Sequence, residues 1–149
     1  MRRRITCLDL IMLLLSALAS CALLACSTSY DAQTDAMLMQ LHGKTVAFLL
    51  HIAYTGDVLA TTYPERLPFY EQAETDLAAL TMRTEALGVN TRTAEELVIL
   101  RNLYIDVQKH DLEQGLSAVY ARALVPVFGG VFRALLTLEV GKKPRIIGP

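Results

Sequence analysis

The chain has 149 residues, 53% of them hydrophobic, and a formal net charge of −1. About 120 residues remain once an N-terminal export signal is removed, which is enough for one domain with a single hydrophobic core. That part carries 11 basic and 14 acidic residues, a net charge of −3. This balance argues against general nucleic-acid binding, which would need a basic surface.

Cysteine is confined to the N-terminal end of the chain, at Cys7, Cys21 and Cys26. The body that follows therefore has no disulfide framework and no thiol chemistry, although export to an oxidising compartment is expected. Packing alone must hold this body together.

The first 25 residues have the pattern of a bacterial lipoprotein signal peptide. Arginines at positions 2–4 precede an apolar run at 8–25, and polar residues follow Cys26. A basic start, an apolar stretch and small residues before a cleavage point define a secretory signal. A cysteine at that point indicates lipidation. We predict a signal-peptide helix at 1–25, a short tether at 26–30 and a lipid anchor.

Two cysteines compete for the lipid. The sequences Leu-Ala-Ser-Cys at 18–21 and Leu-Leu-Ala-Cys at 23–26 both resemble the lipobox. The small residues before Cys21 fit the motif slightly better, but the apolar run continues past it and ends only at Cys26. We favour Cys26 and keep Cys21 as the alternative.

Two other fates of the leader are considered. An uncleaved anchor is possible by length, since 5–25 could just span a bilayer of about 30 Å, but Asp9 within it is costly. Ordinary signal-peptidase cleavage after Ala19 is the other alternative.

The first two helices are expected on either side of the longest loop of the body. Asp31 is predicted to cap a helix that ends near Tyr54, with an apolar stripe at helical spacing. The loop is expected at 56–67, where turn residues cluster. Pro68 is then predicted in the first turn of a second helix, which Gly88 ends as a left-handed C-cap.

The third and fourth helices also carry boundary signals. Thr93 and Glu96 form a capping-box pattern, which predicts a helix start there and an end near Gly115. Ser117 is predicted to cap the last helix, and Pro126 to kink it. Arginines at 122 and 133 argue against a second membrane span. A basic irregular tail is expected at 142–149.

Four apolar stripes of roughly 20 residues, with no alternating run long enough for a sheet, predict an all-α fold. Helices of about 30 Å joined by short loops suit an antiparallel four-helix bundle over residues 31–141.

Short segments resemble a known group of proteins. The segment Tyr-Asp-Ala-Gln-Thr-Asp at 30–35 with Leu41 and Phe48, and the segment 132–139 followed by two lysines, resemble small, uncharacterised helical lipoproteins of Gram-negative bacteria. His110 followed by Gly115 is similar in outline. Pro126 with the glycines at 129–130, and Val46, depart from that pattern. The resemblance implies a location and a fold, and no catalytic residues.

No constellation of residues predicts an enzyme. The histidines His42, His51 and His110 lack the Glu-x-x-His spacing of dimetal bundles, so no metal site is predicted. A haem between His110 and Met37 or Met39 is not favoured, because methionine at such positions usually fills a core. No nucleophile elbow or phosphate loop is present. We expect no cofactor.

Four aromatic residues cluster around the long loop: Tyr54, Tyr63, Phe69 and Tyr70. They are a candidate interaction patch if exposed. Their alternative role, which we prefer, is to close the end of the core.

These observations predict a non-enzymatic lipoprotein of the cell envelope that faces the periplasm, with the outer membrane favoured over the inner. Its partners would be the membrane, through the lipid, and an envelope protein, with no nucleic acid. The alternative function is a small-ligand carrier, in which Pro126 and the two glycines open a gap between helices. An enzyme built from carboxylates and histidines that meet in three dimensions is the third hypothesis.

Overall fold

The computed structural model describes residues 30–55, 62–88 and 91–143, and these residues form four α-helices with no strand among them. The helices are α2 (Ala32–Thr55), α3 (Tyr63–Ala86), α4 (Thr91–Gln114) and α5 (Ala118–Gly141). The predicted all-α class is confirmed, and the arrangement is consistent with a four-helix bundle. The predicted signal peptide, Cys21, Cys26, the tether up to residue 29 and the tail from 144 lie outside the described residues.

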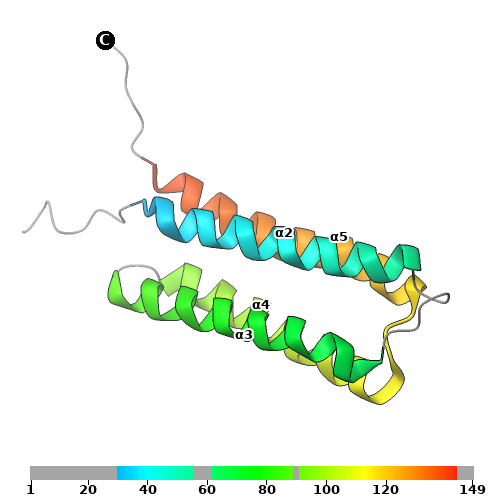
Figure 1. Cartoon of the computed structure of the whole chain (residues 1–149). Coiled ribbons are helices and arrows are strands. Elements are labelled where there is room, and N and C mark those ends of the chain that lie inside the picture. Colours follow the sequence, from blue (N-terminus) through cyan, green and yellow to red (C-terminus); the bar gives the residue numbers. More distant parts are fainter. Residues whose placement is uncertain (1–29, 56–61, 89–90, 144–149) are drawn as a thin grey trace, which may run out of the picture.

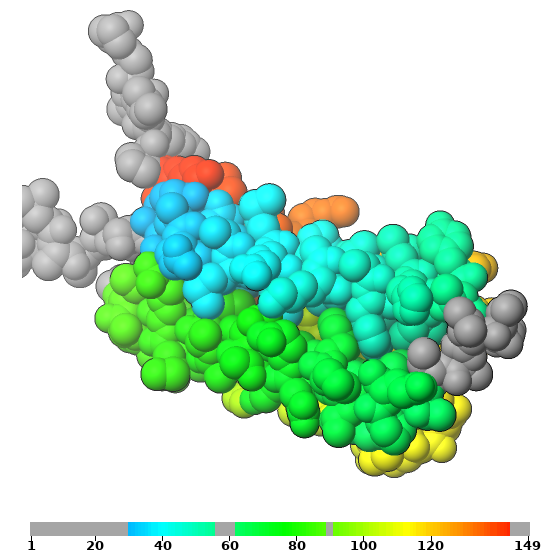
Figure 2. Space-filling model, viewed as in Figure 1, coloured from blue at the N-terminus to red at the C-terminus, as the bar shows by residue number. Residues whose placement is uncertain are grey.

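The four helices form two pairs (Figure 1). Helices α2 and α5 lie side by side in one pair, and α3 and α4 in the other. Contacts also join α2 to α3 and α4 to α5, so each helix touches two neighbours. On the face seen in Figure 2, the side chains of α2 and α3 meet along the length of the bundle. A central core follows from this arrangement.

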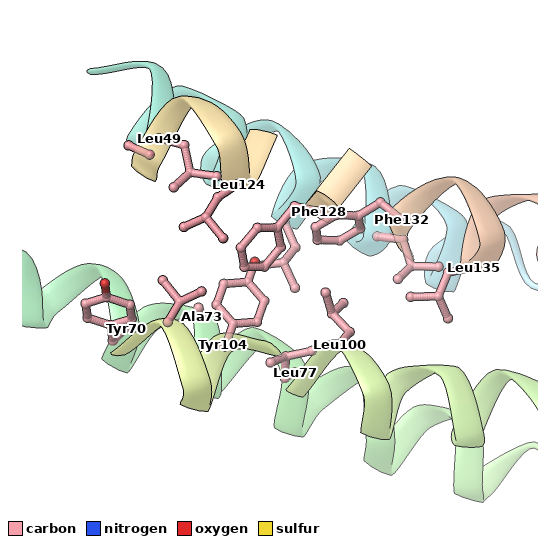
Figure 3. Packing of buried hydrophobic residues seen from close by; sticks show 14 of the residues in the cluster. Leu49, Tyr70, Ala73, Leu77, Leu100, Tyr104, Leu124, Phe128, Phe132 and Leu135 are labelled. Carbon is pink, nitrogen blue, oxygen red and sulfur yellow. The ribbon is translucent and has the colours of Figure 1, made fainter. Parts of the chain in front are cut away.

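The core is built from the apolar stripes of all four helices. Figure 3 shows Phe128 and Phe132 of α5 directed towards Leu100 and Tyr104 of α4. Burial of a leucine or phenylalanine side chain stabilises the fold by about 1.5–3 kcal/mol. Each helix contributes an apolar stripe at helical spacing, as predicted, and the following stripe positions are fully or nearly fully buried: Leu38, Leu41, Ile52, Ala73, Leu77, Leu80, Leu97, Leu100, Tyr104, Val107, Leu124, Phe128, Phe132 and Leu135.

Several predicted helix boundaries are confirmed. The Asp31 carboxylate accepts hydrogen bonds from the amides of Gln33 and Thr34 at 3.3 and 3.2 Å. The Ser117 hydroxyl likewise accepts from the amide of Tyr120 at 3.1 Å. Gly88 has a φ of 67°, the left-handed conformation that glycine adopts without strain. These side chains and this glycine satisfy backbone groups that a helix end leaves free.

The predicted start of the second helix was wrong. Helix α3 begins at Tyr63, so Pro68 lies inside it and Pro64, at the second helical position, takes the first-turn role. The Thr62 amide donates to the Glu65 carboxylate at 2.6 Å, which caps this earlier start. Pro68 is exposed. Its missing N–H costs one hydrogen bond within a helix that tertiary contacts stabilise.

The predicted capping box at Thr93 was also wrong. Helix α4 begins at Thr91, and Thr93 is 1% exposed within its first turn. The Thr93 hydroxyl donates to Glu139 of α5 at 2.9 Å instead of capping its own helix. The sequence pattern predicted that the Thr93 side chain would cap α4, but this side chain binds Glu139 of another helix.

Candidate functional site

A groove of about 740 Å³ runs between α2 and α5. Most of its walls are apolar side chains, and three polar residues also line it. Its lining residues are His42, Val46, Val125, Pro126, Gly129, Gly130, Arg133, Leu136, Thr137 and Val140. The groove therefore includes the proline and both glycines that the sequence singled out in the last helix.

The two glycines leave open space along the groove. A Cβ atom added at Gly129 or Gly130 would lie more than 4 Å from any neighbouring atom of the described residues. Phe128 and Phe132, on the opposite side of α5, point into the core (Figure 3). Each glycine costs about 1 kcal/mol relative to alanine in a helix interior. Packing within the described part of the chain does not require either of them.

The polar part of the groove is cationic. Arg133 is exposed, and the described residues offer it no ion pair or hydrogen bond. The His42 ring packs against Phe132 with centroids 4.9 Å apart. Among the described residues, no acidic side chain lines this groove. An anion that enters this groove meets the Arg133 guanidinium group and no carboxylate from the described part of the chain.

A second groove, of about 540 Å³, lies on the other side of Arg133. It runs between α4 and α5 and shares Gly130, Arg133 and Thr137 with the first. Arg92, Glu95 and Glu96 of α4 line it. Positive and negative side chains both line this second groove, whereas the only charged side chain in the described lining of the first groove is positive.

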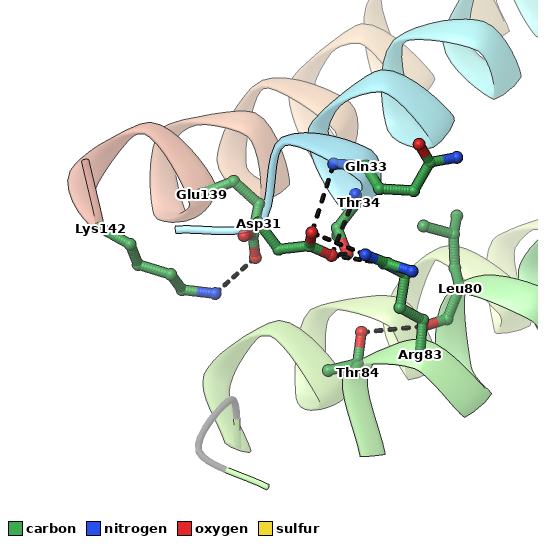
Figure 4. Close-up of polar contacts among 8 residues, drawn as sticks. All are labelled: Asp31, Gln33, Thr34, Leu80, Arg83, Thr84, Glu139 and Lys142. Carbon is green, nitrogen blue, oxygen red and sulfur yellow. Dashed lines mark hydrogen bonds and ion pairs between the residues drawn. The ribbon is translucent and has the colours of Figure 1, made fainter. Parts of the chain in front are cut away.

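Ion pairs tie together the end of the bundle near residue 31 (Figure 4). The Arg83 guanidinium donates to the Asp31 carboxylate in two hydrogen bonds, one of 2.8 Å. This contact holds the pKa of Asp31 well below its usual value. Asp31 therefore caps α2 and links it to the end of α3.

Glu139 is fully buried at the same end. One carboxylate oxygen, Oε1, accepts from Thr93 at 2.9 Å and from Lys142 at 2.5 Å. Figure 4 shows the contact with Lys142. The other oxygen, Oε2, is buried and has no hydrogen-bond partner in residues 30–55, 62–88 or 91–143. Because a buried charge needs a partner, this cluster depends on Lys142.

A second buried ion pair lies towards the other end. Arg66 Nε donates to Asp111 Oδ2 at 2.9 Å, and the Tyr70 hydroxyl donates to the same oxygen at 2.9 Å. Burial, followed by the nearby Asp111 charge, raises the pKa of Tyr70. These three residues lie far apart in the sequence, and no local pattern predicted that they would meet.

The aromatic cluster contains both packed and exposed side chains. Phe69 stacks on Phe48 with centroids 3.7 Å apart, and Tyr70 is 3% exposed. Tyr63 packs near Tyr70 and accepts a hydrogen bond from Gln108 at 3.0 Å. Tyr54 is 81% exposed. The structure brings Tyr63, Phe69 and Tyr70 together and leaves Tyr54 in solvent.

The histidines lie in three different surroundings. His42 lines the groove, His51 is exposed on α2, and His110 packs on Tyr120 with centroids 4.1 Å apart. In the described ranges, no group of three or more His, Cys, Asp or Glu side chains could hold a metal ion.

One described helix, α5, is long and apolar enough to cross a membrane by length and composition. Its most apolar 18-residue window has a mean hydropathy of 1.7, and 28% of that window is buried in the bundle. A core helix of a soluble protein passes the same test. The core position of Phe128, Phe132 and Leu135 accounts for part of this apolar character.

No protein-family model, curated protein or solved structure matches this chain.

Proposed function

We propose that this chain is a non-enzymatic lipoprotein of the bacterial cell envelope, whose helical bundle binds another envelope component. The leader, with its basic start, apolar run and lipobox-like cysteines, supports a lipid anchor on Cys26, with Cys21 as the alternative. The bundle would face the periplasm, with the outer membrane favoured. The resemblance of 30–35 and 132–139 to small helical lipoproteins belongs to the same proposal.

The observation that carries the binding role is the exposed side of α5. Among the described helices, α5 alone is long and apolar enough to cross a membrane, but only 28% of its most apolar stretch is buried in the bundle. Val119 and Val127 are 75% and 47% exposed on it. An apolar surface left outside a bundle is a common mark of an interaction site.

The finer architecture is part of the proposal: an antiparallel bundle whose last helix bends at Pro126. Contacts between helix ends support the alternating direction. Asp31 before α2 meets Arg83 near the end of α3, and Thr93 near the start of α4 meets Glu139 near the end of α5. Proline inside a helix removes one hydrogen bond and favours a bend.

Metabolic labelling with an alkyne fatty acid tests the anchor. We expect Cys26→Ala to abolish labelling of the full chain and Cys21→Ala to leave it. Labelling that survives both substitutions would contradict the lipoprotein proposal.

Photo-crosslinking in intact cells tests the binding surface. A photoreactive residue at Val127 of α5 is expected to give an adduct of defined mass. The matched control is Val98 of α4, which is 57% exposed and is expected to give none. Identical adducts at both positions, or none at Val127, would contradict a binding role for this surface.

A second candidate function is a small-ligand carrier in the periplasm, and the groove between α2 and α5 favours it. Its volume of about 740 Å³ falls in the range of ligand sites, which is roughly 300–1,000 Å³. Saturable binding of a small molecule that protects groove residues from modification would support this function.

A further inference from the structure

The groove between α2 and α5 is long. Along α5 it extends from Val125 to Val140, a separation of fifteen residue steps, or about 22 Å at 1.5 Å per step. Val46 of α2, with Val125, Leu136 and Val140 of α5, supplies apolar walls. An elongated apolar groove suits a chain-like ligand better than a compact one.

The glycine pair presents no side chain to this groove. Both positions are helical, and both have open space where a Cβ would lie. Alanine would fit at either position and would favour the helix. The space above Gly129 and Gly130 is therefore available to a ligand and is not taken up by internal packing.

The charged side chain that lines the groove favours an anionic ligand. Arg133 lies beside the glycines, has no ion-pair partner among the described residues and faces no carboxylate within the groove. A guanidinium group pairs well with a carboxylate or phosphate, through up to two parallel hydrogen bonds. Thr137 and His42 add polar groups to the same lining.

From this juxtaposition we infer that the groove binds a single-chain amphiphile with an anionic head. Its alkyl chain would lie over the glycines towards Val46 and Val125, and its carboxylate or phosphate would meet Arg133. The inference rests on the carrier function proposed above and names its ligand class. It depends on residues 42–140 and not on the lipid anchor.

Photoaffinity labelling of the full chain in phosphatidylcholine vesicles tests this inference. The probes are dodecanoic acid and dodecanol, each with a diazirine in the alkyl chain, so that they differ only in the head. We expect dodecanoic acid to label peptides containing Val46 and Val125–Val140 saturably. Competition by unlabelled dodecanoate or by lysophosphatidylglycerol then separates a free acid from a lipid head group as the natural source.

Two variants separate the alkyl and anionic parts of the site. Gly130→Leu should fill the groove and weaken labelling by both probes, whereas Gly43→Leu, at an exposed helical glycine outside the lining, should not. Arg133→Gln should weaken dodecanoate labelling about tenfold and leave dodecanol unchanged. Arg92→Gln, in the neighbouring groove, is the matched charge control. Circular dichroism confirms that each variant is folded.

The outcomes distinguish the ligand class from the carrier function. Saturable labelling by dodecanol that equals that by dodecanoate, with no effect of Arg133→Gln, would overturn the anionic class and leave a carrier. An absence of saturable labelling by either probe would overturn both. A dimer in sedimentation, with groove peptides protected by the second copy and unlabelled, would also overturn the inference.

Discussion

Arg66 of α3 and Asp111 of α4 form an ion pair inside the bundle, and the carboxylate also accepts the Tyr70 hydroxyl. The Asp111 side chain is 0% exposed and that of Arg66 is 9% exposed. Removal of one partner of such a pair costs far more than the pair contributes, because the other charge stays in the interior.

We therefore expect Asp111→Ala to lower the free energy of unfolding by about 3–5 kcal/mol. The double variant Arg66→Met/Asp111→Leu should recover part of this loss, because it removes both buried charges and leaves only the Tyr70 hydroxyl without its acceptor. Urea unfolding followed by circular dichroism measures both. A double variant as unstable as Asp111→Ala would contradict the explanation.

Acid should weaken the link between Asp31 and Arg83. The pKa of Asp31 is lower in the folded chain than its unfolded value of about 3.9, so the stabilisation is complete above that value and is lost as pH falls below it. Arg83→Gln should flatten this acid limb of the stability profile. Arg101→Gln, at an exposed pair with Glu74, is the control and should leave the limb unchanged.

Two glycine substitutions should have opposite effects. Gly130→Ala should raise the free energy of unfolding by about 1 kcal/mol, because the added Cβ meets open space in a helix interior. Gly88→Ala should lower it by about 1–2 kcal/mol, because residue 88 has a φ of 67°. Thermal unfolding of the two variants measures both shifts. Equal shifts of the same sign would contradict these backbone assignments.

The Thr93 hydroxyl should stabilise the fold through its hydrogen bond to Glu139 and not by capping α4. Thr93→Val keeps the shape but removes the donor to the buried carboxylate, so we expect a loss of about 1–3 kcal/mol in unfolding free energy. Thr93→Ser keeps the donor and should restore most of it. Thr91→Val, at an exposed position, is the control. Equal losses at positions 91 and 93 would point to helix propensity instead.

Helical periodicity predicted the apolar core, because leucines and aromatics recur where each helix faces its neighbours. The same periodicity, extended by one turn, reaches three buried charged or polar residues whose tertiary contacts were not predicted. Asp111 follows Val107 by four residues, Glu139 follows Leu135 by four, and Thr93 precedes Leu97 by four. A charged residue that continues an apolar stripe at helical spacing therefore indicates a buried ion pair, and Asp111 and Glu139 both lie at such positions.

The partner of each buried charge was out of reach of such reasoning. Arg66 also lies on its stripe, four residues before Tyr70, yet nothing local relates it to Asp111, 45 residues away. Either Pro64 or Pro68 could occupy the first turn of a helix, where a missing N–H costs little. Helix α3 begins beside the earlier proline, and the contacts that Arg66 and Tyr70 make with Asp111 stabilise the added turn. The groove was predictable only as a gap near Pro126 and the glycines, since its walls depend on how α2 meets α5.

The first and last described residues, Tyr30 and Lys143, contact each other at one end of the bundle. The Tyr30 hydroxyl donates to Asp35 at 2.8 Å, and the Lys143 ammonium lies 4.6 Å from the centre of the Tyr30 ring. Asp31 holds α3 through Arg83 at the same place. A mechanical load applied through the chain before Tyr30 is therefore shared among α2, α3 and α5. Separation of α2 from the bundle under such a pull would require these contacts with α3 and with Lys143 to break first.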